Sequence, residues 1–132
     1  MKKTVSTLTI LVLVMGVLTA CQTGSANTVT LTEQDAGKTI ELKTGDTLLV
    51  SLEGNMTTGF SWIPAPQDPV LLEQVGAIAV TPESDAIGAS GMLVLTFKAT
   101  TAGQTTLHLD YKRSWEENVT PEKTFDVTVV VK

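Results

Sequence analysis

Residues 48–62 read LLVSLEGNMTTGFSW, and this stretch predicts two β-strands joined by a short turn. Apolar residues alternate along both halves, as in strands that bury one face: Leu48, Val50, Leu52, then Phe60 and Trp62. Gly54 and Asn55 mark the turn between them. The tip, residues 56–59, has two small threonine side chains and a glycine that can adopt a positive φ. Its backbone could therefore enter a narrow cleft, although an ordinary hairpin turn would use the same residues.

The same alternation recurs along most of the chain and predicts further short strands. The residues that carry it are Val29 and Leu31; Ile40 and Leu42; Leu93, Leu95 and Phe97; Leu107, Leu109 and Tyr111; and Phe125, Val127, Val129 and Val131. No long segment has a helical period, and residues 69–76 could form either one short helical turn or a buried strand. The pattern predicts an all-β protein, an immunoglobulin-like β-sandwich of about seven or eight antiparallel strands.

The first 20 residues have the composition of a secretory signal peptide, with Lys2 and Lys3 ahead of an apolar stretch over residues 8–18. That stretch is shorter than the roughly 20 apolar residues of a membrane-spanning helix. Residues 18–21 read LTAC and resemble the cleavage site of bacterial lipoproteins. The resemblance implies that Cys21 is lipidated and anchors the protein to a membrane of the bacterial cell envelope. Gln22 favours the outer membrane over the inner one.

The expected domain organisation is a signal peptide over 1–20, a lipidated cysteine and flexible tether over 21–27, and one folded domain over 28–132. Seven basic and 14 acidic residues remain after position 20, so the net charge of −7 argues against a nucleic-acid partner. Cys21 is the only cysteine, which excludes an intrachain disulfide. We expect a monomer that depends on its apolar core.

The side-chain inventory argues against an enzyme. His108 is the single histidine, and its place between Leu107 and Leu109 predicts an ordinary surface residue on the outer face of a strand. One histidine with scattered carboxylates does not provide a zinc site. Glu116 and Glu117 are adjacent and point in different directions, so a glycosidase pair is unsupported. We expect no cofactor and no metal.

The two tryptophans have different predicted roles. Trp62 keeps the register of the strand and should pack beneath the turn, where its indole N–H could bond a backbone carbonyl. Trp115 follows Arg113 and Ser114 in a polar segment, and exposed Trp and Arg often dominate binding interfaces. Alternatively, Trp115 lies flat over a neighbouring strand with Arg113 stacked on it.

Three segments at strand junctions together resemble the chagasin-type inhibitors of papain-family cysteine peptidases, whose loops carry Asn-Pro-Thr-Thr-Gly-(Phe/Tyr)-x-Trp, Gly-x-Gly-Gly and Arg-Pro-Trp. The matching segments here are residues 55–62 (NMTTGFSW), 88–91 (GASG) and 113–115 (RSW). Met56 and Ser114 stand where the family has proline, and Ser90 stands where it has glycine. Because proline restricts φ, we expect the first and third loops to be less preorganised than in the family.

The resemblance implies a reversible, competitive inhibitor that blocks the active-site cleft of a papain-family cysteine peptidase with three loops. The implied peptidase-binding residues are Asn55, Met56, Thr57, Thr58, Gly59, Phe60, Gly88, Ala89, Ser90, Gly91, Arg113, Ser114 and Trp115. Thr57, Thr58 and Gly59 would enter the cleft, while the other two segments would contact its walls. The alternative is a structural or adhesive envelope lipoprotein that uses an immunoglobulin-like domain, because a fold does not determine function.

Overall fold

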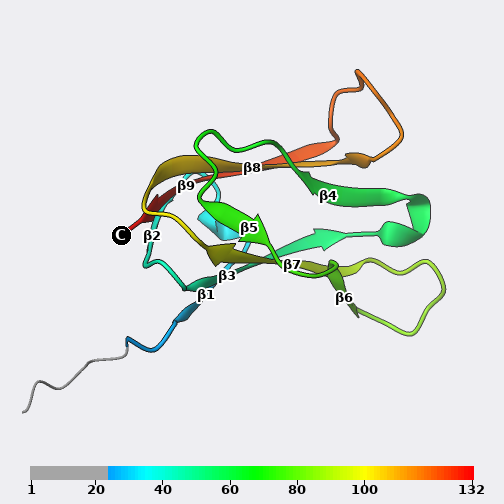
Figure 1. The fold of residues 1–132 in the computed structure, drawn as a ribbon. Coiled ribbons are helices and arrows are strands. Elements are labelled where there is room, and N and C mark those ends of the chain that lie inside the picture. Colours follow the sequence, from blue (N-terminus) through cyan, green and yellow to red (C-terminus); the bar gives the residue numbers. More distant parts are fainter. Residues whose placement is uncertain (1–23) are drawn as a thin grey trace, which may run out of the picture.

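The computed structural model describes residues 24–132, so Cys21 and the predicted signal peptide lie outside the described residues. Two β-sheets pack face to face (Figure 1). The strands are β1 (Thr28–Leu31), β2 (Thr39–Leu42), β3 (Thr47–Gly54), β4 (Phe60–Pro64), β5 (Leu72–Gln74), β6 (Ala79–Pro82), β7 (Gly91–Ala99), β8 (Gly103–Arg113) and β9 (Lys123–Val131). Two short 3-10 helices, η1 (Glu33–Asp35) and η2 (Met56–Thr58), lie between strands. Within residues 24–132, no helix has the length and apolar character needed to cross a membrane.

The core lies between the sheets and is built by the alternation seen in the sequence. One sheet has the order β1-β3-β7-β5, with β6 also paired to β7, and the other has the order β2-β9-β8-β4. The inward side chains of the four long strands are almost fully buried: Leu48, Val50 and Leu52; Leu93, Leu95 and Phe97; Leu107 and Leu109; Val127 and Val129. Burying such side chains stabilises a fold by about 1.5–3 kcal/mol each. The predicted sandwich is therefore confirmed.

Two strand pairs are parallel, which differs from the expected wholly antiparallel arrangement. β1 runs parallel to β3, and β2 runs parallel to β9. Asp46 stabilises the first of these pairs, because its carboxylate accepts hydrogen bonds from the backbone N–H groups of Asn27 (2.9 Å) and Lys43 (2.8 Å). The bond from Asn27 holds the start of β1 beside the start of β3, and the bond from Lys43 closes the turn that precedes β3. Alternation of apolar residues determines which face of a strand is buried but not the direction of its neighbour.

Within the described part of the chain the sandwich has nine strands, more than the expected seven or eight, because two short strands lie between β4 and β7. Residues 72–74 form β5, so the segment 69–76 contains a strand and not a helical turn. β6 covers residues 79–82, all exposed, and pairs with the first half of β7. An exposed strand of four residues has no apolar alternation, so the sequence pattern did not reveal it.

The ends of the sandwich differ in what they carry. The described chain enters at one end, where the C-terminus also lies (Figure 1). The β3–β4, β6–β7 and β8–β9 connections lie at the opposite end (Figure 1). We call these the first loop (residues 55–59), the second loop (residues 83–90) and the third loop (residues 114–122). The three motif-bearing segments therefore lie at or next to one end of the molecule.

Candidate functional site

The first loop is a compact turn held by its own side chains. Its η2 turn begins after Asn55, whose side-chain Oδ1 accepts hydrogen bonds from the backbone N–H of Thr57 (3.0 Å) and from the Thr57 hydroxyl. The hydroxyl of Thr58 donates to the carbonyl of Asn55 (2.9 Å). Gly59 closes the turn at φ 82°, a left-handed conformation in which an L side chain is strained. These bonds order the turn although Met56 replaces the family's proline.

Strand residues fix the base of the first loop. The backbone N–H of Asn55 donates to the Tyr111 hydroxyl on β8 (2.8 Å), and the indole N–H of Trp62 donates to the carbonyl of Glu53 (3.1 Å). The centroids of the Trp62 and Tyr111 rings lie 5.1 Å apart, and Trp62 is only 2% exposed. The predicted role of Trp62 beneath the turn is confirmed. Tyr111 is a site-supporting residue that the sequence interpretation assigned only to the core.

The second loop is joined to the first through Asn55. The side-chain N–H of Asn55 donates to the carbonyl of Gly88 (2.8 Å), a residue at φ 79°. Within the second loop the backbone N–H of Ala89 donates to the carbonyl of Ala86 (3.1 Å). Ile87 beside Gly88 is fully exposed. The loop therefore has a tight turn at its tip and a single side-chain bridge to its neighbour.

Gly91 lies outside the second loop, although the sequence motif groups it with Gly88, Ala89 and Ser90. It is the first residue of β7 and is buried. A Cβ atom at this position would lie 2.6 Å from the backbone oxygen of Thr81, so only glycine fits against β6. Its evident function is close strand pairing, whereas Ala89 and Ser90 are half-buried in the loop.

The third loop is joined to the first through Arg113. Its Nε donates to the carbonyl of Thr58 (3.0 Å), and its guanidinium carbon lies 4.4 Å from the centre of the Phe60 ring. Glu116 lies 3.4 Å from Nη1 of the same side chain. Arg113 therefore stacks on Phe60, which differs from the alternative in which it would stack on Trp115. Arg113, next to the third loop, thus binds the Thr58 carbonyl of the first loop.

Trp115 extends over the first loop and is 67% exposed. Its indole lies against Gly59, because a Cβ atom added to Gly59 would be 2.3 Å from Cη2 of Trp115. The side chain is therefore accessible to a partner while one edge of its ring rests on the turn. Ser114, which precedes it, is exposed at the start of the loop. The three loops form one connected surface, with Trp115 exposed at its side.

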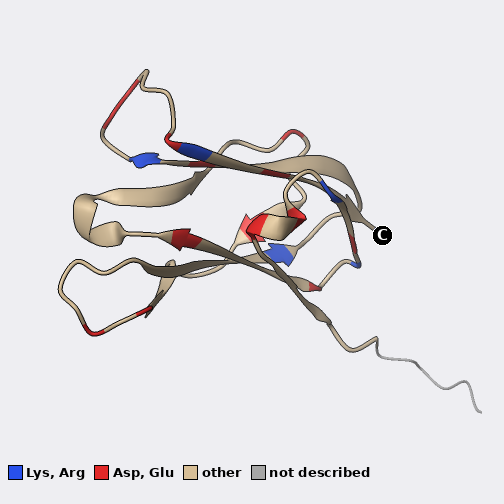
Figure 2. Cartoon of the chain, turned by 180° about the vertical axis from the view of Figure 1, so that it is seen from behind, with Lys and Arg blue, Asp and Glu red and all other residues tan. Residues whose placement is uncertain are grey.

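Charge is arranged unevenly over this surface. Figure 2 shows no charged residue in the first loop and acidic residues in both neighbouring loops. These are Glu83 and Asp85 in the second loop and Glu116, Glu117 and Glu122 in the third. The side chains of the first loop therefore carry no charge that would have to be desolvated on binding.

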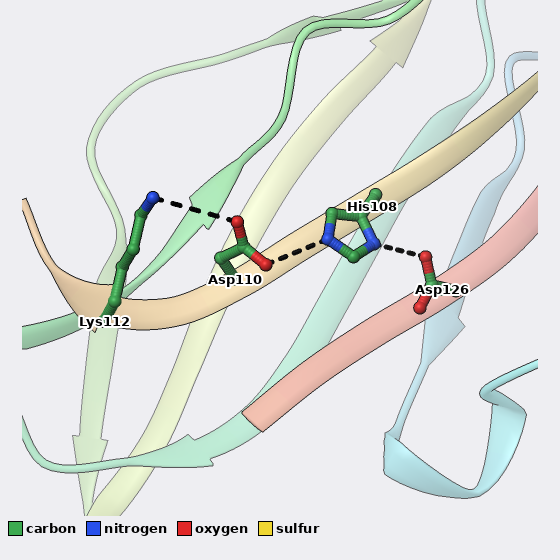
Figure 3. Close-up of polar contacts among 4 residues, drawn as sticks. All are labelled: His108, Asp110, Lys112 and Asp126. Carbon is green, nitrogen blue, oxygen red and sulfur yellow. Dashed lines mark hydrogen bonds and ion pairs between the residues drawn. The ribbon is translucent and has the colours of Figure 1, made fainter. Parts of the chain in front are cut away.

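His108 lies on the outer face of β8, as predicted, within a small network of charged side chains (Figure 3). Nδ1 faces Asp126 on β9, and Nε2 lies 2.9 Å from Asp110. Lys112 approaches the second carboxylate oxygen of Asp110 at 3.9 Å. The hydrogen bond with Asp126, and then that with Asp110, raise the pKa of His108 above its ordinary value of 6.5. Among residues 24–132 no group of three or more acidic, His or Cys side chains is arranged to bind a metal ion.

Comparison with known proteins finds that the chain is similar to peptidase inhibitors. The sequence model of the chagasin family of peptidase inhibitors, I42, matches residues 41–129. Amoebiasin-2 of Entamoeba histolytica is 29% identical over 103 residues, which cover 77% of this chain and 84% of that protein. The crystal structure of the cysteine protease inhibitor EhICP2 from the same organism superposes with a TM-score of 0.70 at 23% identity, covering 82% of this chain and 98% of the other. The solution structure of amebosin gives 0.64 at 26% identity, with 83% and 100% covered.

Proposed function

The chain belongs to the chagasin family of peptidase inhibitors, I42, and on this premise we propose that it is a reversible, competitive inhibitor of papain-family cysteine peptidases. The observation that carries the proposal is the connection of the three loops. An uncharged turn lies between two loops and is hydrogen-bonded to the second loop and to Arg113, the strand residue that precedes the third loop. No cofactor takes part in this mechanism, and the family consists of inhibitors, not of enzymes.

The first loop is the part that enters the active-site cleft. Thr57 and Thr58 are exposed, have short side chains, and are followed by Gly59, which has none. The turn is too tightly curled to lie along a cleft in the extended form of a peptide substrate, since η2 covers residues 56–58. The backbone therefore occupies the cleft without presenting a peptide bond in an extended segment for attack.

The other two loops bind the walls of the cleft. On one side, Gly88, Ala89 and Ser90 allow close contact through backbone atoms. On the other side, the exposed indole of Trp115 provides the main apolar contact, and aromatic anchors of this kind often dominate binding. Because the loops are already connected in the free protein, binding does not have to order them separately, which favours affinity.

A titration of papain tests the proposal directly. Papain with a known concentration of active sites is titrated with residues 22–132 of this chain, and residual activity is followed with a small substrate. We expect stoichiometric, reversible loss of activity, with an apparent inhibition constant that rises with substrate concentration. Trypsin serves as the control and should remain active. Full activity of both papain and a cathepsin L-like enzyme at micromolar inhibitor would refute the assignment.

We also propose that Cys21 is lipidated and that the protein is anchored at the bacterial outer membrane. The support is the sequence alone: a basic start, a short apolar stretch and LTAC at residues 18–21. Metabolic labelling with a fatty acid tests it, with Cys21→Ser as the matched variant. Label in the natural protein and none in Cys21→Ser is the expected result. Equal labelling of the two would remove the lipoprotein assignment.

A further inference from the structure

We propose that Asn55 is a positioning residue whose side-chain amide holds the second loop against the first, and that it does not act as a contact for the peptidase. The proposal rests on the inhibitory function proposed above for the three loops. It changes the expected role of Asn55, which the motif alone groups with the peptidase-binding residues of the first loop.

Both the oxygen and the nitrogen of the Asn55 side-chain amide form hydrogen bonds within the protein. Oδ1 accepts from the backbone and the hydroxyl of Thr57, within the same turn. Nδ2 donates to the carbonyl of Gly88, 33 residues away in the second loop. Asn55 is also less exposed than Met56 and Thr57, which follow it. Its side chain is thus directed between the two loops and not outward to a partner.

The hydrogen bond from Asn55 to the Gly88 carbonyl fixes the tip of the second loop relative to the first loop. Within residues 24–132, it is the single hydrogen bond that joins the second loop to the first. The other three bonds of the second loop are internal: Glu83 N–H donates to the Ser90 carbonyl (3.1 Å), Ala89 N–H to the Ala86 carbonyl (3.1 Å) and Ala86 N–H to the Ser84 hydroxyl oxygen (3.4 Å). These internal bonds give the loop a shape but leave its tip free to move relative to the first loop.

A loose second loop would weaken inhibition without any loss of contact residues. Binding would then have to fix the orientation of the loop, and that ordering cost is subtracted from affinity. The effect should appear mainly in the association rate, because fewer encounters would find both loops in the binding arrangement. Asn55 thereby acts through the position of Gly88 and its neighbours.

Asn55→Asp separates the two functions of the amide. Aspartate has nearly the same shape and keeps an oxygen that can accept from Thr57, so the cap of the turn is preserved. It lacks the N–H donor, and its second oxygen would face the carbonyl of Gly88. Gln104→Glu is the matched control, because it makes the same change from amide to carboxylate at an exposed position near the start of β8, at the end opposite the loops. Both variants should fold, since neither position is in the core.

Two measurements on the purified protein test the proposal. The first is hydrogen exchange of the free protein, in which the amides of residues 83–90 should exchange faster in Asn55→Asp than in the natural protein or Gln104→Glu. The second is the rate of association with papain, with dissociation measured separately. We expect inhibition by Asn55→Asp to be weaker by about tenfold, equivalent to about 1.4 kcal/mol, mostly through slower association. Gln104→Glu should behave like the natural protein.

The possible outcomes separate this proposal from the function on which it rests. Unchanged exchange in the second loop of Asn55→Asp would overturn it, whatever happens to inhibition. Weaker inhibition with unchanged exchange would identify Asn55 as a peptidase contact instead. Faster exchange with unchanged association would show that the bridge has no part in binding, which also overturns it. If the natural protein inhibits neither papain nor a cathepsin L-like enzyme, the inhibitory function fails, and the exchange data alone decide whether Asn55 holds the loop.

Discussion

Replacing Gly59 by alanine tests the contact between the first and third loops. Gly59 has φ 82°, and a Cβ atom there would lie 2.3 Å from Cη2 of Trp115 and 3.2 Å from two further ring atoms. The substitution therefore has two separate costs. One is the left-handed backbone conformation, and the other is the displacement of the indole.

The two costs can be estimated separately. A left-handed conformation costs an L-residue about 1–2 kcal/mol relative to glycine. Trp115 is largely exposed and can rotate away, so its displacement should cost no more than a distorted rotamer, about 0.5–1.5 kcal/mol. The expected destabilisation by Gly59→Ala is therefore about 1.5–3.5 kcal/mol.

Urea unfolding of matched variants measures each part. Gly76→Ala is the control for the backbone, because Gly76 has φ 70° and no atom within 4 Å of an added Cβ. Gly59→Ala in a Trp115→Ala background removes the clash and should cost only what Gly76→Ala costs. If Gly59→Ala is no more destabilising than Gly76→Ala, or if removing the indole gives no relief, Trp115 does not rest on the first loop and this reasoning is wrong.

Three further predictions concern binding, the core and pH. Removing the indole with Trp115→Ala should weaken inhibition of papain by about 2 kcal/mol, roughly thirtyfold, mainly through faster dissociation; equal inhibition constants would contradict this. In urea unfolding, Leu95→Ala should cost about 2–4 kcal/mol because Leu95 is fully buried, whereas Thr57→Ala at the exposed loop should cost less than about 1 kcal/mol. Folding favours the protonated form of His108, because the pKa of this residue is raised in the folded protein. Its contribution to the free energy of unfolding is therefore complete below pH 6.5 and is lost as the pH rises through the higher folded pKa. His108→Gln should reduce the loss of stability that urea unfolding measures as the pH rises. An unchanged dependence of stability on pH would show that the contact with Asp126 is not formed.

The β-sandwich could be predicted from the sequence because apolar residues occupy almost every second position of the long strands. Residues such as Leu95 and Val127 occupy inward positions that a period of two identifies directly. The parallel partners of β1 and β2 could not be predicted in this way. Their direction depends on bonds such as that from Lys132 N–H to the carbonyl of Leu42 (2.8 Å), between residues 90 positions apart.

The site was predictable as a set of residues but not as an arrangement. The motif identified the turn at residues 55–59, and its local cap by Asn55 is typical of that residue type. The bridge from Asn55 to Gly88 and the bond from Arg113 to Thr58 join segments that are distant in sequence. Gly91 has a structural reason that the motif did not indicate, because a Cβ atom there would lie 2.6 Å from the backbone oxygen of Thr81 on β6.

The entry of the chain at the end opposite the loops has a practical consequence. The two ends are separated by the length of the sandwich, about 35 Å for a strand of 11 residues such as β8. A bead, a carrier protein or a sensor chip joined ahead of residue 24 would therefore be kept away from Trp115 and the first loop. The molecule could be immobilised in a single orientation, with every copy presenting the same face to solution. Capture of an enzyme on such a surface should need no linker longer than the few residues that precede β1.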